Sequence, residues 1–165
     1  MSAITGDPVL NFGELFPGIT ESSGGLNGRV YGVQQSVSWA LTPPLTVDGT
    51  TYQVVAFVAP VNGCFIKNIW ISGKVKAAGG TSTIAFDNFD ASANAAGNVL
   101  STTNVNALTV ITTINEGVEL TLNTTAENLV MDEGDVLSST YVTGTETTNG
   151  QGYAATAIII VPVVL

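Results

Sequence analysis

The residues of this sequence that could carry chemistry are mainly carboxylates, because the chain has no histidine and one cysteine, Cys64. Without histidine, the Ser-His-Asp and Cys-His arrangements of nucleophilic catalysis and a His-ligated zinc site are excluded. Two carboxylates could still act as acid and base in glycoside hydrolysis. The candidates for such a pair are Asp87, Asp90, Glu116, Glu119, Asp132, Glu133 and Asp135.

The sequence around these carboxylates does not favour catalysis. A sugar-cleaving site needs aromatic platforms in a cleft, whereas both tryptophans, Trp39 and Trp70, lie in apolar strand patterns. The phosphate-binding motif G-x-x-x-x-G-K-[ST] does not occur. We therefore predict that the protein is not an enzyme and has no cofactor.

The densest acidic cluster is the run Asp132-Glu133-Gly134-Asp135. Its oxygen atoms could bind calcium, but their spacing does not match an EF-hand loop. Gly134 can adopt a positive φ without steric cost, and Asp side chains commonly hydrogen-bond the backbone of a turn. We interpret the run as a tight turn facing water, which opens the strand predicted at 136–142 and sets its register. We predict no metal site.

The charge of the chain limits its partners. Its net charge is −9, and its basic residues are Arg29, Lys67, Lys74 and Lys76. Phosphate binding needs a basic patch, so nucleic acid is not an expected partner. The opening M-S-A-I-T-G-D lacks the basic and apolar regions of a signal peptide. The final I-I-I-V-P-V-V-L is too short to span a bilayer. We expect a protein made in the cytoplasm, with no membrane partner.

The elements that position these residues are predicted to be strands. Charged residues make up 10% of the chain, against a usual ~25%, and Thr, Ser, Asn and Gly take their place. Strand patterns separated by turn signals occur at 33–41, 52–59, 64–75, 82–89, 118–122, 136–142 and 153–164. Less regular strands are predicted at 99–100 and 108–114, and a loop at 90–98. An all-β fold follows, and we favour a jelly-roll-like antiparallel β-sandwich over residues 46–165.

Residues 1–45 have a different character. Prolines and a Gly-rich run at 22–25 separate small apolar clusters, and a strand pattern follows at 33–41. We interpret 1–45 as an extended N-terminal arm and linker that packs on the body or on a neighbouring subunit. The predicted contact residues are Phe12, Leu15, Phe16 and Trp39.

Three predicted strands, 52–59, 64–71 and 156–164, are apolar on both faces. Simple alternation places Val54 and Val58 opposite Val55 and Phe57, and Ile66 and Trp70 opposite Phe65, Ile69 and Ile71. A sheet with one face in water should be apolar on one face only, so a second cover is expected. Covering ~150 Å² on each strand would contribute ~10 kcal/mol at ~25 cal/mol per Å². We predict a homo-oligomer and favour a trimer over a dimer.

From Gln53 onward the layout resembles the phage head decoration (capsid cement) proteins. The segments that carry this resemblance are V-V-A-F-V-A-P-V-N-G-C-F-I-K-N-I-W-I, S-T-I-A-F-D-N-F, V-E-L-T-L, N-L-V-M-D-E-G-D-V-L-S-S-T and T-G-T-E followed by G-Q-G. The resemblance implies a structural virion protein on the outer surface of an icosahedral head, commonly a trimer. Its implied partner is the major capsid protein, whose neighbouring subunits it would clamp.

Two other interpretations remain open. A tail, fibre or receptor-binding β-module would recognise a cell-surface glycan and occur in few copies per particle. A cellular binding or surface-layer module would not associate with particles at all. The interpretation as a decoration protein differs from both, because it predicts hundreds of copies per particle.

Overall fold

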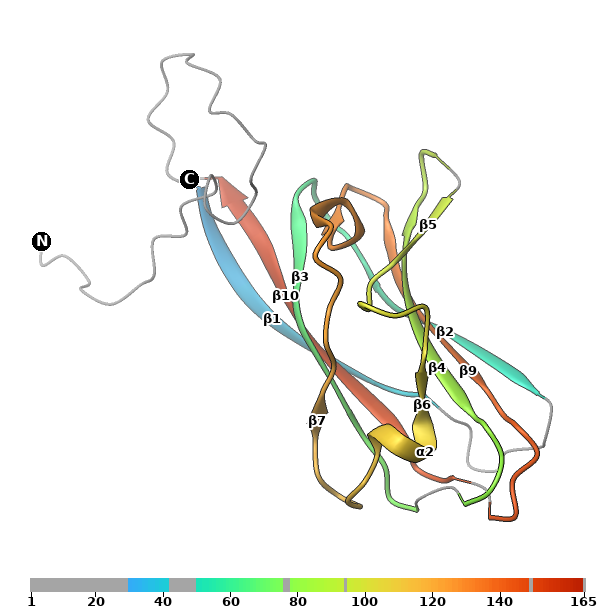
Figure 1. Cartoon of the computed structure of the whole chain (residues 1–165). Coiled ribbons are helices and arrows are strands. Elements are labelled where there is room, and N and C mark those ends of the chain that lie inside the picture. Colours follow the sequence, from blue (N-terminus) through green and yellow to red (C-terminus); the bar gives the residue numbers. More distant parts are fainter. Residues whose placement is uncertain (1–29, 42–49, 76–77, 94, 149, 165) are drawn as a thin grey trace, which may run out of the picture.

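The computed structural model describes residues 30–41, 50–75, 78–93, 95–148 and 150–164, and these are built mainly from strands (Figure 1). One sheet, sheet A, has the order β1 (Val30–Ala40), β10 (Ala154–Val164), β3 (Cys64–Ser72), with β7 (Val118–Glu119) and β8 (Val130–Met131) both on the far edge of β3. Sheet B has the order β2 (Thr51–Val58), β9 (Val136–Val142), β4 (Thr83–Asp90), with β5 (Ala95–Asn98) and β6 (Val105–Asn106) on the far edge of β4.

The connections between the sheets are those of a jelly roll. Strands β1 to β4 alternate between sheet A and sheet B, and β9 and β10 then insert between the early strands of each sheet. Every strand pairing in the described residues is antiparallel. The predicted all-β sandwich is therefore confirmed, and its strand order is that of two interleaved Greek keys.

The core lies between the two sheets. Sheet A contributes Ile66, Ile69, Ile71, Ala157 and Ile159, and sheet B contributes Ile84, Phe86, Leu137 and Tyr141; all are buried. Asn88 on β4 links the sheets at one edge, because its Nδ2 donates to the Val130 carbonyl of β8 at 2.6 Å. Cys64 is a buried free thiol in this core, as its position at the start of an apolar strand predicts.

The strand predicted at 136–142 is confirmed with these bounds as β9, whereas two other predictions were wrong. Residues 95–98, predicted as loop, form β5 and pair with Asp87–Asp90. Strand pairing uses backbone hydrogen bonds, so it needs no apolar side chain. Gly97 also lets Asn128 pack closely, because a Cβ added at Gly97 would lie 2.6 Å from the Asn128 Oδ1 atom.

The strand predicted at 108–114 is instead the short helix α2 (Ala107–Val110). The Ile111 amide donates to the Ala107 carbonyl at 3.1 Å, and both residues are buried. The buried apolar positions 107 and 111 thus have the four-residue spacing of a helix. A second short helix, η1 (Ala126–Asn128), leads into β8.

β-Bulges correct the face assignments of the strands that are apolar on both faces. In β3 the register with β10 skips Lys67, so Ile66 and Ile69 both point into the core and Trp70 points out. In β2 the register with β9 skips Ala56, which turns Phe57 inward opposite Leu137. Simple alternation fails at both places because a bulge inserts one unpaired residue and shifts the side-chain parity.

The described part of the predicted arm, residues 30–41, belongs to the sandwich. Strand β1 pairs with β10 from Val30↔Val164 to Ala40↔Ala154, and Leu41 is buried in the core. The pairing of β10 with β3 ends at Ile160↔Phe65, so beyond it β1 and β10 continue as a two-stranded ribbon (Figure 1). The predicted arm residues 1–29 and 42–45 lie outside the described residues, and a domain boundary at residue 45 stays a prediction.

Candidate interaction surfaces

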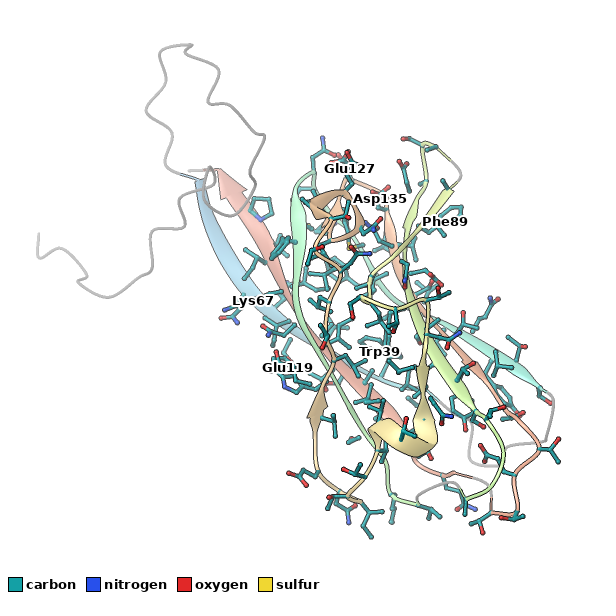
Figure 2. The ribbon with its side chains drawn as sticks, in the orientation of Figure 1. Trp39, Lys67, Phe89, Glu119, Glu127 and Asp135 are labelled. Carbon is teal, nitrogen blue, oxygen red and sulfur yellow. The ribbon has the colours of Figure 1, made fainter. Side chains whose placement is uncertain are left out.

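Of the predicted contact residues, the structure describes Trp39, while Phe12, Leu15 and Phe16 lie outside the described residues. The Trp39 ring packs edge-to-face on Phe86 of the opposite sheet, with the ring centroids 6.0 Å apart. Its Nε1 donates to the Ser139 hydroxyl on β9 at 2.9 Å. Figure 2 shows Trp39 among the side chains between the sheets. This tryptophan therefore joins β1 to sheet B.

The acidic turn at 132–135 holds loops together with one of its carboxylates. Asp135 is buried, and its Oδ1 and Oδ2 accept hydrogen bonds from the backbone amides of Ala91 at 3.1 Å and Asp132 at 2.8 Å. Gly134 has a φ of 92°, and its amide donates to the Ala59 carbonyl. Asp132 and Glu133 are exposed. The turn forms as predicted, and Asp135 accepts hydrogen bonds from the backbone of its own turn and of the loop that follows β4.

The remaining candidate carboxylates have separate surroundings. The Asp90 Oδ1 accepts hydrogen bonds from the Ala93 amide and from the amide and hydroxyl of Ser92, which hold the pKa of Asp90 below its usual range. Glu119 Oε1 accepts a hydrogen bond from Asn68 Nδ2. Glu116 is exposed in the loop before β7. In the described residues no group of three or more His, Cys, Asp or Glu side chains could hold a metal ion.

A polar cluster at the end of the sandwich near the loop 143–152 was not anticipated from the sequence. The buried Ser82 hydroxyl donates to Glu146 Oε1 and accepts from the Gly144 amide, and Glu146 Oε2 accepts from the Gly150 amide. Burial, more than the nearby Glu146 charge, raises the pKa of Tyr141 to about 12. Although Ser82 lies close by, the Tyr141 hydroxyl makes no hydrogen bond of normal geometry with any of the described residues. These hydrogen bonds join the loop that follows β9 to Ser82, which directly precedes β4.

The outer face of sheet A is partly apolar. Trp70 and Ile158 are half-buried there, and Ile160 next to Phe65 is 8% exposed. Lys67 at the bulge is exposed, and Glu119 lies on the same side of the molecule (Figure 2). The Ser38 and Thr156 hydroxyls hydrogen-bond across β1 and β10 at 2.8 Å. This face therefore combines an aromatic ring with amide, carboxylate and hydroxyl groups.

The outer face of sheet B carries the more exposed apolar side chains. Val55 is 63% exposed and Val58 is 53% exposed, and both lie on β2 at the edge of the sheet. Their cross-strand partners on β9 are Ser138 and Val136. On this sheet face, aliphatic side chains thus stand in place of the polar residues that usually face water.

No protein-family model matches the chain, and no curated protein matches it. Among solved structures the chain is similar to "Cyanophage Pam1 capsid asymmetric unit", with 16% sequence identity and a TM-score of 0.48. The aligned part covers 88% of this chain and 98% of that chain.

In the part of the chain that the structure describes, no helix is both long enough and apolar enough to cross a membrane.

Proposed function

We propose that this protein is a structural virion protein that decorates an icosahedral phage head and stabilises it by clamping neighbouring major capsid subunits. The observation that carries the proposal is the exposed aliphatic surface on the outer face of sheet B. The segments that resemble decoration proteins support it, since they include β2, β3 and the turn that opens β9. The carboxylates Asp135 and Glu146 support the fold, which suits a structural role.

The proposal includes self-association and a location on the outer surface of the head. A homotrimer is the oligomer that the resemblance implies, and Phe12, Leu15 and Phe16 are the proposed contacts of residues 1–29 with the capsid or with a neighbouring copy. For Trp39 the proposed contact role is indirect, because its ring packs on Phe86 and would hold β1 in place. Contacts made by a linked arm and a body together strengthen attachment.

Quantitative mass spectrometry of purified parent particles tests the proposal. We expect a ratio of this chain to the major capsid protein that is near one or a simple fraction of it. A handful of copies per particle would contradict decoration of the head and favour a tail or fibre protein. Absence from every particle would exclude a virion role.

The proposed arm contact is tested by deleting residues 1–29. A deletion through residue 41 would remove β1 from sheet A and confound attachment with folding, since Leu41 lies in the core and Trp39 packs against it. We expect the shorter deletion to lose capsid attachment while its circular dichroism spectrum remains that of a β-protein. Unchanged attachment would show that the arm is not needed.

A tail, fibre or receptor-binding module that recognises a cell-surface glycan is the second candidate. The observation that favours it is the outer face of sheet A, where half-buried Trp70 lies close to Asn68 and Glu119. An aromatic face with neighbouring amide and carboxylate groups can stack on a sugar and hydrogen-bond its hydroxyls. A glycan array with the wild type and Trp70→Ala tests it. Binding that the variant loses would favour this module over head decoration.

A further inference from the structure

The outer face of sheet B has an ordered arrangement of side chains across three strands. Cross-strand pairing aligns Val58, Val136 and Phe89 in one row. The adjacent row consists of Val55, Ser138 and Asp87. Residues paired across adjacent strands point to the same face, so these side chains form one surface. Figure 2 shows Phe89 on β4 at the side of the molecule away from sheet A.

The bulge in β2 creates the apolar half of this surface. Because Ala56 has no partner in the register, Val55 and Val58 oppose residues two positions apart on β9 and point to the same side. In a regular strand, residues three apart point to opposite faces. The bulge therefore places two exposed valines together at the sheet edge while Phe57 enters the core.

Asp87 is the charged group of these two rows. It is half-buried, and its cross-strand neighbours are the polar residues Ser138 and Asn98. Within the described residues, no hydrogen bond or ion pair to its carboxylate is found, and burial raises its pKa. A partly desolvated carboxylate with no partner is stabilised when a cationic side chain approaches it.

We propose that the outer face of sheet B docks a protein partner that places a Lys or Arg side chain on Asp87 and apolar side chains on Val55, Val58 and Phe89. The inference rests on the proposed function, in which this partner is a capsid subunit, and it names the surface and the chemistry of the contact. Charge complementarity favours a different protein over a symmetric second copy. Two copies joined face to face about a twofold axis would bring their Asp87 carboxylates toward each other, and the chain carries a net charge of −9.

The experiment measures the occupancy of parent particles that lack this protein after incubation with the purified full-length chain. Three variants alter the surface: Val55→Ser with Val58→Ser, Asp87→Asn, and Asp87→Lys. Two controls make the same kinds of change at exposed positions elsewhere on the molecule. Ile114→Ser changes an aliphatic side chain that is 51% exposed, and Glu127→Gln removes an exposed carboxylate. Each variant is checked by circular dichroism and by its thermal midpoint.

We expect the concentration for half-occupancy to rise at least tenfold for the double serine variant and for Asp87→Lys, and severalfold for Asp87→Asn. The controls should remain within twofold of the wild type. Raising the salt concentration should weaken the wild type more than Asp87→Asn, because salt screens the proposed ion pair and the variant lacks that pair.

The outcomes separate this inference from the proposed function. Wild-type binding with all three surface variants unchanged would overturn the docking surface and leave the decoration role standing. Failure of the wild type to bind any parent particle would overturn both. Surface variants that lower the oligomeric mass of the free chain in light scattering would show that a second copy occupies this face, which would also overturn the inference.

Discussion

At the scale of single residues, the buried polar side chains account for much of the specificity of the fold. Asp135 accepts hydrogen bonds from backbone amides of two segments. The Ser139 hydroxyl accepts a hydrogen bond from the Trp39 indole across the sandwich. A buried acceptor with its donors in place costs little, whereas donors left without an acceptor cost ~1–3 kcal/mol. These contacts therefore fix which loops and sheets meet, more than they add to the total stability.

Asp135→Asn should destabilise the protein by ~1–3 kcal/mol, because an amide offers one acceptor oxygen where the carboxylate offers two. Either the Ala91 or the Asp132 amide would then face an NH₂ group. Urea unfolding, followed by tryptophan fluorescence, measures the change. Glu133→Gln in the same turn is the control and should stay within ~0.5 kcal/mol, since its side chain is exposed. Equal values for the two variants would contradict the role of Asp135.

Asp87 and Asp90 are three residues apart, and their pKa values should be shifted to opposite sides of ~3.9, the usual pKa of Asp. Asp90 accepts three hydrogen bonds, so its pKa is lowered and its contribution to stability is present above ~3.9 and lost as pH falls through its folded-state pKa. Burial raises the pKa of Asp87, so its contribution falls as pH rises from ~3.9 through its folded-state pKa.

Carbon-detected NMR of the side-chain carboxyls measures both midpoints in one titration. Asp87→Asn and Asp90→Asn, which each remove one signal, provide the assignments. A midpoint for Asp90 above that of Asp87 would contradict the surroundings that the structure gives them.

At the scale of elements, close backbone approaches decide where loops can cross. At Gly80 φ is +80°, and an added Cβ would lie 2.0 Å from the Thr145 carbonyl oxygen. At Gly144 an added Cβ would lie 2.7 Å from the Thr81 amide nitrogen. Both obstacles are backbone atoms, which cannot rotate away as a side chain can. The loop before β4 and the loop after β9 can therefore cross only with glycine on each side.

Gly80→Ala should destabilise the protein by more than ~2 kcal/mol, because it adds strain at a positive φ to a clash with backbone. The thermal midpoint by calorimetry measures the loss. Gly117→Ala is the matched control, because no atom of the described part of the chain lies within 4 Å of its added Cβ. The control should leave stability within ~1 kcal/mol of the wild type. A Gly80 variant as stable as the control would mean that the two loops do not cross as described.

At the scale of the whole molecule, β1 is part of the sandwich although it lies within the segment 1–45 that was predicted as an arm. It supplies Trp39 and Val37 to the core, and it covers the edge of β10 along eleven residues. We therefore expect residues from 30 onward to determine the stability of the sandwich, and residues 1–29 to affect attachment to a partner but not that stability.

Deleting residues 1–41 should cost at least ~4 kcal/mol, since it removes the Trp39 and Leu41 side chains from the core, each worth ~2–5 kcal/mol. Deleting residues 1–29 removes none of the described contacts and should retain the cooperative thermal transition. Near-ultraviolet circular dichroism and calorimetry of both truncations measure the difference. Equal midpoints for the two truncations would show that β1 is dispensable to the fold.

The proposed docking surface was only partly predictable from the sequence. The sequence indicates that β2, β3 and β10 are apolar on both faces, and the exposed Val55 and Val58 confirm this for β2. Which side chains face out was predicted wrongly at the bulges, because an extra residue leaves no mark in the hydrophobic pattern. The cluster of Ser82, Glu146 and Tyr141 was missed, because its members lie far apart in the chain and meet only when the loops fold over the sandwich end.

The sequence by itself determined the all-β class, the main strands and the acidic turn, because alternation of side chains and turn residues are local properties. It also excluded histidine chemistry, which depends on composition alone. Only the tertiary structure decided that β1 joins sheet A, that 107–110 is helical, and that Asp87 shares a face with Val55 and Val58. These features depend on strand register and on contacts between distant segments, where one bulge reverses the face of every residue that follows.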